Sequence, residues 1–213
     1  MTTHPAGNPQ PYPPQPGVHD PYAQQPQHQP RQQPQYQQSG PVAGPAERGR
    51  GATALILVST ILLGLMAGLF FAFDVSVMPG LAKADDRTYV TAMQNFNAAI
   101  DGNPLFGMAF MVALLLPVVS AILEYRKGRR NVAVWVAVGA VLYFVVLMIT
   151  FSVNIPLNNE LADAGNAAKM TDFSIVDKFK TTWVTTNILR TLLSTVALTA
   201  LSRALVLYGR ATR

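Results

Sequence analysis

Four long apolar segments constrain what this chain can fold into. They cover residues 52–73, 105–123, 132–153 and 188–207, and the first and third contain no charged residue. A helix rises about 1.5 Å per residue, so about 20 residues span the ~30 Å hydrocarbon core of a bilayer. The sequence therefore predicts an all-α integral membrane protein, a four-span transmembrane helix bundle whose first partner is the lipid bilayer.

The N-terminal quarter has the opposite composition. Residues 1–51 hold 12 of the 16 prolines, all three histidines and many glutamines, with almost no aliphatic side chains. Such a segment cannot bury enough apolar surface to offset the entropy lost on ordering. We therefore predict two parts, a disordered Pro/Gln-rich cytoplasmic tail over residues 1–51 and a four-helix transmembrane domain over residues 52–213.

Composition excludes several kinds of chemistry. The chain has no cysteine and residues 52–213 have no histidine, which excludes thiolate, haem-histidine and Ser-His-Asp sites. No glycine-rich phosphate loop is present, and the carboxylates are too few for a di-iron bundle. An enzyme built on this chain is expected to use no tightly bound metal, nucleotide or other cofactor. The net charge of +5 does not indicate nucleic acid, because the basic residues lie beside apolar segments.

Basic residues predict the orientation of the chain. Nine lysines and arginines flank the first span, lie in the loop at 124–130, or lie near the end of the fourth span and beyond it. The two long loops hold five basic and eight acidic residues. The positive-inside rule then places both termini in the cytoplasm and both long loops outside, in a multi-pass protein of the plasma membrane.

Both outer loops contain helical patterns. Apolar residues recur at helical spacing within residues 85–102, which predicts a short amphipathic helix. Asp172 lies where it can cap a second helix, and no Gly or Pro interrupts residues 171–207. This second helix is therefore expected to run straight into the fourth span.

Polar residues gather at the outer end of the predicted bundle. Arg190 lies just inside the fourth apolar segment, where an ionisable residue is costly and marks a functional site by default. Trp183, Asn187 and Arg190 are spaced i, i+4 and i+7, so they share one helical face. Topology brings further polar side chains of both hairpins to the same end, namely Asp74, Asn97, Asn154, Asn158 and Glu160.

We predict that these residues form an outer polar pocket in which Arg190 pairs with a carboxylate, Asp74 or Glu160. The alternative is an interfacial role, in which Trp183 anchors at the headgroups, Arg190 snorkels and the asparagines cap helix ends. Interfacial anchors need no shared face, which favours the pocket.

Gly64 and Gly68 form a G-x-x-x-G pattern in the first span. Two small residues one turn apart let another helix approach closely. Packing within the chain is the favoured interpretation, and a homo-oligomer through Gly64 and Gly68 is the alternative.

Short motifs in a fixed order resemble a known family. They are, along the chain, Gly64 and Gly68, Val77-Met78-Pro79-Gly80-Leu81, Met93-Gln94-Asn95-Phe96-Asn97, Asn103-Pro104-Leu105-Phe106, Asn154-Ile155-Pro156-Leu157-Asn158, and then Trp183, Asn187 and Arg190. In order and spacing these motifs resemble the anthrone oxygenase-like family of four-helix integral membrane proteins, over nearly all of residues 52–208. Members linked to aromatic polyketide biosynthesis resemble oxygenases that convert an anthrone to an anthraquinone with dioxygen.

The resemblance implies a cofactor-independent oxidation of an anthrone-like planar aromatic, in which a stabilised carbanion meets dioxygen. Such a site needs an apolar slot, donors for the developing oxyanion and a base. Catalytic roles are then expected for four donors and one base; these are Arg190, Asn154, Asn158 and Asn187, with Asp74 as the base. Trp183, Asn97 and Glu160 are expected to bind the substrate, and Glu160 is the alternative base.

A second class of function stays open. The same pocket suits a non-catalytic membrane protein that binds a lipid, a quinone-like ligand or a protein partner. The polar residues would then only hold the second hairpin together.

Overall fold

The structure is a computed structural model that describes residues 45–211 of the chain. Within this range every helix or strand assignment is helical, which confirms the all-α fold class. Residues 1–44, 212 and 213 lie outside the described residues, and with them most of the predicted tail. The first helix, α1 (Pro45–Ala72), begins inside the predicted tail. Proline suits a first helical position because its missing N–H would have no partner there.

Four long helices are each long and apolar enough to cross a membrane, which confirms the predicted spans. Three of them are composite, and in each a π turn joins two α-helices. The first continues from α1 through η1 (Phe73–Val77) into α2 (Met78–Leu81). The second is α4 (Pro104–Arg126). The third comprises α5 (Arg130–Ile149), η2 (Thr150–Asn154) and α6 (Ile155–Asp163), and the fourth comprises α7 (Ser174–Lys178), η4 (Phe179–Trp183) and α8 (Val184–Ala211).

The composite helices extend beyond the apolar segments at one end. Pro79 and Pro156 come soon after η1 and η2, in the first turn of α2 and of α6. A proline inside a continuous helix removes one backbone donor, and here it falls just after the π turn at which the hydrogen-bond register changes. The fourth helix is continuous from Ser174, as expected, and Asp172 accepts a hydrogen bond from the Ser174 N–H at 2.9 Å.

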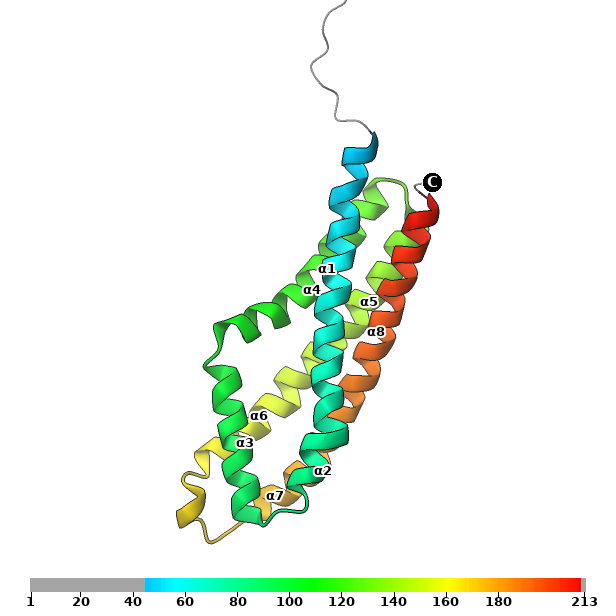
Figure 1. Ribbon diagram of the computed structural model, residues 1–213. Helices are drawn as coiled ribbons and strands as arrows, with labels where there is room; N and C mark the ends of the chain where they lie inside the picture. Colours follow the sequence, from blue (N-terminus) through cyan, green and yellow to red (C-terminus); the bar gives the residue numbers. More distant parts are fainter. Residues whose placement is uncertain (1–44, 212–213) are drawn as a thin grey trace, which may run out of the picture. The chain divides into compact units, whose positions relative to one another are not determined.

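The two ends of the bundle differ (Figure 1). The start of α1, the turn between α4 and α5 and the end of α8 lie together at one end, called here the basic end. At the other end, called the α3 end, lie α2, α6, α7 and the amphipathic helix α3 (Asp86–Asp101). This helix confirms the prediction for residues 85–102. Asp85 caps it by accepting hydrogen bonds from Thr88, which lower the pKa of the Asp85 carboxyl below its usual value.

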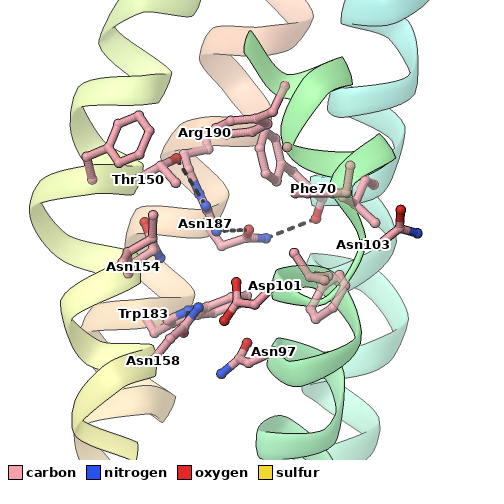
Figure 2. A pocket seen from close by; sticks show the side chains of 18 of the residues that line it. Phe70, Asn97, Asp101, Asn103, Thr150, Asn154, Asn158, Trp183, Asn187 and Arg190 are labelled. Carbon is pink, nitrogen blue, oxygen red and sulfur yellow. Dashed lines mark hydrogen bonds between the residues drawn. The ribbon is translucent and has the colours of Figure 1, made fainter. Parts of the chain in front are cut away.

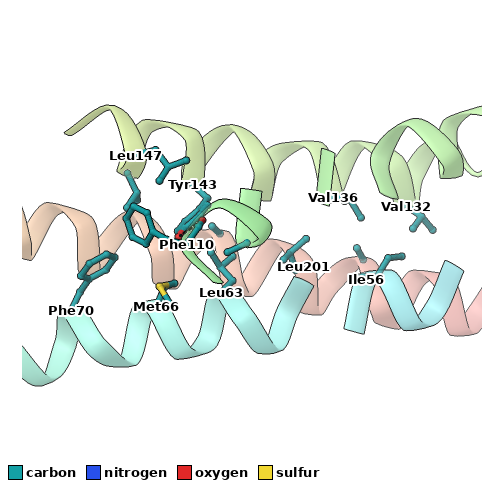
Figure 3. Packing of buried hydrophobic residues seen from close by; sticks show 14 of the residues in the cluster. Ile56, Leu63, Met66, Phe70, Phe110, Val132, Val136, Tyr143, Leu147 and Leu201 are labelled. Carbon is teal, nitrogen blue, oxygen red and sulfur yellow. Dashed lines mark hydrogen bonds between the residues drawn. The ribbon is translucent and has the colours of Figure 1, made fainter. Parts of the chain in front are cut away.

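A central apolar core joins α1, α4, α5 and α8 (Figure 3). Leu63 of α1, Val136 and Tyr143 of α5 and Leu201 of α8 are fully buried within it. A smaller apolar cluster packs α3 onto the ends of the long helices, with Tyr89, Met93 and Phe179 at its centre. The α3 end is therefore covered by a packed helix.

Gly139 lets α5 and α8 approach closely. A Cβ at this position would lie 3.1 Å from the Leu201 side chain and 3.2 Å from the Ala197 carbonyl oxygen. In contrast, a Cβ at Gly64 would meet only the Leu198 side chain at 3.8 Å, and one at Gly68 would meet nothing within 4 Å. Gly64 thus lies against α8 of the same chain, and the homo-oligomer through Gly64 and Gly68 stays a prediction.

We expect Gly139→Ala to destabilise the folded protein by about 1–3 kcal/mol, because the added methyl meets a backbone oxygen that cannot move aside. Gly68→Ala is the matched control, and we expect it to be neutral or stabilising by up to about 1 kcal/mol. Denaturant unfolding of both variants in the same micelles measures the difference. Equal stability of the two variants would contradict this packing.

A buried ion pair lies at the basic end. Glu124 of α4 is only 1% exposed, and both of its carboxylate oxygens accept hydrogen bonds from Arg129. The Arg129 guanidinium also lies 4.8 Å from the centre of the Tyr208 ring of α8. Together these contacts link α4, the following turn and α8, and the hydrogen bonds from Arg129 let Glu124 remain buried.

Candidate functional site

A cavity of about 330 Å³ lies between the long helices near the α3 end. Its walls come from α1, α4, the α5–α6 helix and the α7–α8 helix, and α3 contributes Asn97 and Asp101. Much of the wall is aromatic, including Phe70, Phe106 and Phe110. Figure 2 shows polar side chains from α3, α5–α6 and α8 around this space. Six of the eight predicted site residues line it; these are Arg190, Asn154, Asn158, Asn187, Trp183 and Asn97.

Arg190 is the cation of the cavity and is only 5% exposed. It donates hydrogen bonds to the side-chain amide oxygen of Asn187 at 2.7 Å and to the Thr150 hydroxyl at 3.3 Å. Its guanidinium lies 4.5 Å from the Phe70 ring centre and 5.4 Å from that of Trp183. Cation–π contacts of this kind stabilise a desolvated guanidinium. Its Nε has no hydrogen-bond partner among residues 45–211.

The predicted ion pair of Arg190 with Asp74 or Glu160 is wrong, since Arg190 forms no ion pair within residues 45–211. Asn187 lies between Arg190 and Asp74 and contacts both. Its amide nitrogen donates to the Asp74 carboxylate and to the Phe70 carbonyl oxygen, the latter at 2.9 Å. Because the nitrogen is engaged on that side, the Asn187 oxygen faces Arg190.

Asp74 does not line the cavity. Its two carboxylate oxygens accept hydrogen bonds from Asn187 and from the Thr191 hydroxyl. It lies behind Asn187, where it fixes the orientation of that amide. This position does not suit the role of catalytic base that the sequence predicted for Asp74.

Glu160 also lies outside the cavity, where it forms an exposed ion pair with Lys178. Asn154 and Asn158 are one turn apart and share the face of the third helix that lines the cavity. Glu160 follows Asn158 by two residues, which is about 200° further around the helix, so the Glu160 side chain points away from the cavity. The substrate-binding role predicted for Glu160 is not supported by this position.

Asn154, Asn158 and Trp183 form one wall. The side-chain amide oxygen of Asn158 accepts a hydrogen bond from the Trp183 indole N–H at 3.0 Å, which fixes the plane of the indole. The side-chain nitrogen of Asn154 donates to the Thr186 hydroxyl at 3.0 Å. The side-chain oxygen of Asn154 is buried and has no partner among the described residues. Trp183 also stacks on Phe179, with ring centres 6.0 Å apart.

The opposite wall comes from α3. Asn97 and Asp101 are one turn apart, so both side chains lie on the face that lines the cavity. The Asp101 carboxylate points into the cavity (Figure 2) and is the only carboxylate among the lining residues. The Asn97 amide nitrogen is buried without a partner. Gln94 ties α3 to the third helix by donating to the carbonyl oxygens of Leu161 and Gly165 at 2.8 and 2.9 Å.

Sequence reasoning missed Asp101 and Thr150 as lining residues. Asp101 follows Asn97 by one helical turn inside the helix predicted at 85–102, and this spacing was the signal that could have identified it. Thr150 lies in the apolar interior of the third span and carries no comparable signal.

The three π turns all lie beside the cavity. η1 supplies Phe73, η2 begins with Thr150 and ends with Asn154, and η4 ends with Trp183. A π turn holds one extra residue and so rotates the side chains that follow it relative to a regular helix. Such turns are frequent at functional sites. Here they set which side chains of three helices face the cavity.

The cavity combines apolar walls with a polar, positively charged side. Aromatic rings supply apolar walls, and Arg190 supplies a positive charge beside an amide network. Two buried donors, Arg190 Nε and Asn97 Nδ2, and one acceptor, Asn154 Oδ1, have no partner. Buried polar atoms without partners are costly, and a ligand could pair with these three only if their side chains turned toward the cavity.

The fold and the cavity define a multi-pass membrane protein with an amphipathic cavity near one end of its bundle. The model of the anthrone oxygenase family matches residues 96–200, which include Asn97, Asp101 and Arg190. This match confirms the resemblance to the anthrone oxygenase-like family that was drawn from the motifs of the chain. No curated protein and no solved structure matches the chain significantly.

Proposed function

We propose that this protein is a cofactor-independent oxygenase, of the monooxygenase type, that oxidises an anthrone-like aromatic with dioxygen. One observation carries the proposal. In a chain that the family model matches over residues 96–200, a buried guanidinium without an ion pair among the described residues and a single carboxylate line the same aromatic cavity. A carbanion mechanism needs these two groups, a cation for the anion and a base for the proton.

The proton acceptor in this proposal is Asp101, in place of Asp74 or Glu160. Asp101 takes a proton from the CH₂ group opposite the anthrone carbonyl, and the negative charge moves onto the carbonyl oxygen. Arg190 and the amide nitrogen of Asn97 stabilise that oxyanion. Trp183, held by Asn158, stacks on the planar ring.

Dioxygen completes the reaction with atoms and electrons in balance. The carbanion carbon forms a bond to one oxygen atom of O₂, and the resulting peroxide takes up a proton. Loss of the second C–H proton then breaks the O–O bond, which leaves a carbonyl on carbon and releases water. The CH₂ carbon is oxidised by four electrons and dioxygen is reduced by four, so no external reductant is consumed.

The direct test is oxygen uptake by the full chain in lipid nanodiscs supplied with an anthrone, measured together with the absorbance of the anthraquinone formed. Anthrones react slowly with oxygen unaided, so protein-free nanodiscs set the background. We expect a saturable rate well above this background, with equal amounts of oxygen consumed and quinone formed. A rate no higher than that of protein-free nanodiscs rules out the activity on that substrate.

Non-catalytic binding is the second candidate, and the internal hydrogen bonds favour it. Asn158 pairs with Trp183, and Asn187 pairs with both Asp74 and Arg190. Residues that satisfy one another in this way also suit a static pocket for a quinone-like ligand or a lipid. A quinone that binds tightly to the protein, together with no oxygen uptake on any anthrone, would support this second function.

We further propose that the basic end lies in the cytoplasm and the α3 end outside, in the plasma membrane. The basic residues at the α4–α5 turn and near the end of α8 support this orientation under the positive-inside rule. The chain has no cysteine, so single-cysteine variants report position cleanly. We expect Ser174→Cys to react with a membrane-impermeant thiol reagent in intact cells, and Lys127→Cys to react only after lysis. The reverse pattern would overturn this orientation.

A further inference from the structure

Two exposed apolar side chains belong to the wall of the cavity. Met111 of α4 is 43% exposed and Phe151 of η2 is 53% exposed, and both line the cavity. Each continues a stripe of exposed apolar residues along its own helix. Met111 leads into Leu115 and Val118 on α4, and Phe151 continues a stripe that contains Phe144 and Met148 on α5. In a membrane-spanning bundle such stripes face lipid.

Gly107 lies one turn before Met111 on α4 and also lines the cavity. A Cβ built at Gly107 would meet nothing within 4 Å. Glycine inside a helix costs about 1 kcal/mol relative to alanine, and close packing usually explains it. No neighbour explains it here, so what Gly107 provides is open space in the α4 wall.

We propose that the cavity opens sideways into the bilayer between α4 and the α5–α6 helix, at a mouth formed by Gly107, Met111 and Phe151. The ligand is then a membrane-dissolved amphiphile that enters from lipid. This inference rests on the cavity and its walls and does not depend on the proposed oxidation.

The polarity of the walls defines the chemical class of this ligand. Its body is uncharged and apolar, because it must partition into lipid and pass three apolar positions at the mouth, and the aromatic lining residues favour an aromatic ring system. Its inner edge carries a carbonyl or hydroxyl oxygen, because Arg190 and Asn97, whose side chains carry hydrogen-bond donors, both line the cavity. A ligand that enters from water would instead pass the exposed residues Asp101 and Asn103 on the polar side of the cavity.

A cysteine inside the cavity reports the entry route. Thr150 is buried, lines the cavity and is close in size to cysteine, so Thr150→Cys places one thiol inside a chain that has no other. The full chain in nanodiscs is treated either with pyrenylmaleimide, which dissolves in lipid, or with a small anionic methanethiosulfonate, which stays in water. Mass spectrometry measures the rate of modification. We expect the lipid-soluble reagent to modify the Thr150→Cys variant at least about tenfold faster than it modifies the double variant that also carries Gly107→Leu.

Gly68→Leu is the matched control, because Gly68 is also a span glycine with open space at its Cβ and does not line the cavity. It is expected to leave the rate unchanged, and Gly107→Ala to give a smaller decrease than Gly107→Leu. The proposal is overturned if the variant with Gly107→Leu is modified as fast as the variant with Gly68→Leu. It is also overturned if the aqueous reagent modifies the thiol faster than the lipid-soluble one, when each rate is expressed relative to that reagent's rate with a free thiol in solution. Because the readout is thiol modification, it stands whether or not the protein oxidises an anthrone.

Discussion

Arg190→Ala is expected to lower the rate of anthrone oxidation by about 10²–10³-fold, the usual cost of removing a group that stabilises a developing oxyanion. The guanidinium is held by Asn187 and Thr150 and lies against Phe70 and Trp183, so it is fixed in place before the substrate binds. The loss should appear in kcat, because the negative charge on the substrate develops only as the proton leaves.

Arg190→Lys separates charge from geometry. Lysine keeps a positive charge but loses the planar stack and the forked hydrogen bonds. We expect partial activity, between that of Arg190→Ala and the unchanged protein. Thermal unfolding of both variants shows whether the fold survives, since Arg190 is buried. Full activity in a folded Arg190→Ala protein would remove Arg190 from the mechanism.

Asp101→Asn is expected to lower kcat by about 10²–10⁴-fold, the range that general-base catalysis contributes. Asparagine has nearly the same shape but cannot accept the proton. Asp101 is exposed at the end of α3, so the fold should survive the change. Asp163→Asn is the matched control, because Asp163 is an exposed aspartate at the end of α6 that does not line the cavity.

Isotope substitution separates proton removal from binding. With deuterium on the CH₂ carbon of the anthrone, the Asp101→Asn variant should show a larger kinetic isotope effect than the unchanged protein, because proton removal becomes more rate-limiting. Quinone binding, followed by tryptophan fluorescence, should change little. An Asp101→Asn variant with normal kcat would exclude this carboxylate as the base, even if the oxidation itself is real.

The sequence was sufficient to predict the spans and most of the polar residues that line the cavity, because both depend on patterns that survive without coordinates. Apolar length predicts a span, and a shared helical face brings Trp183, Asn187 and Arg190 together. Topology then adds Asn154, Asn158 and Asn97. These predictions need only the helical period and the order of the spans.

The partners of these residues could not be predicted in the same way. Helical spacing does not say which side chain lies between two charges, so the position of Asn187 between Arg190 and Asp74 was missed. The π turns change the register of three helices, and neither apolar length nor helical spacing identifies them. The pairing of Glu124 with Arg129 across the end of α4 was missed because basic residues in that loop were read only as a topology signal.

The fate of the oxygen atoms in ¹⁸O₂ tests most directly whether this cavity oxidises its ligand with dioxygen. The full chain in nanodiscs, given an anthrone under ¹⁸O₂, should yield anthraquinone with one ¹⁸O atom at the new carbonyl and one ¹⁸O atom in water. Both products should fall to the protein-free background in Arg190→Ala. Quinone formed by the unchanged protein with unlabelled oxygen at that carbonyl would contradict the account, because the oxygen would then have come from water.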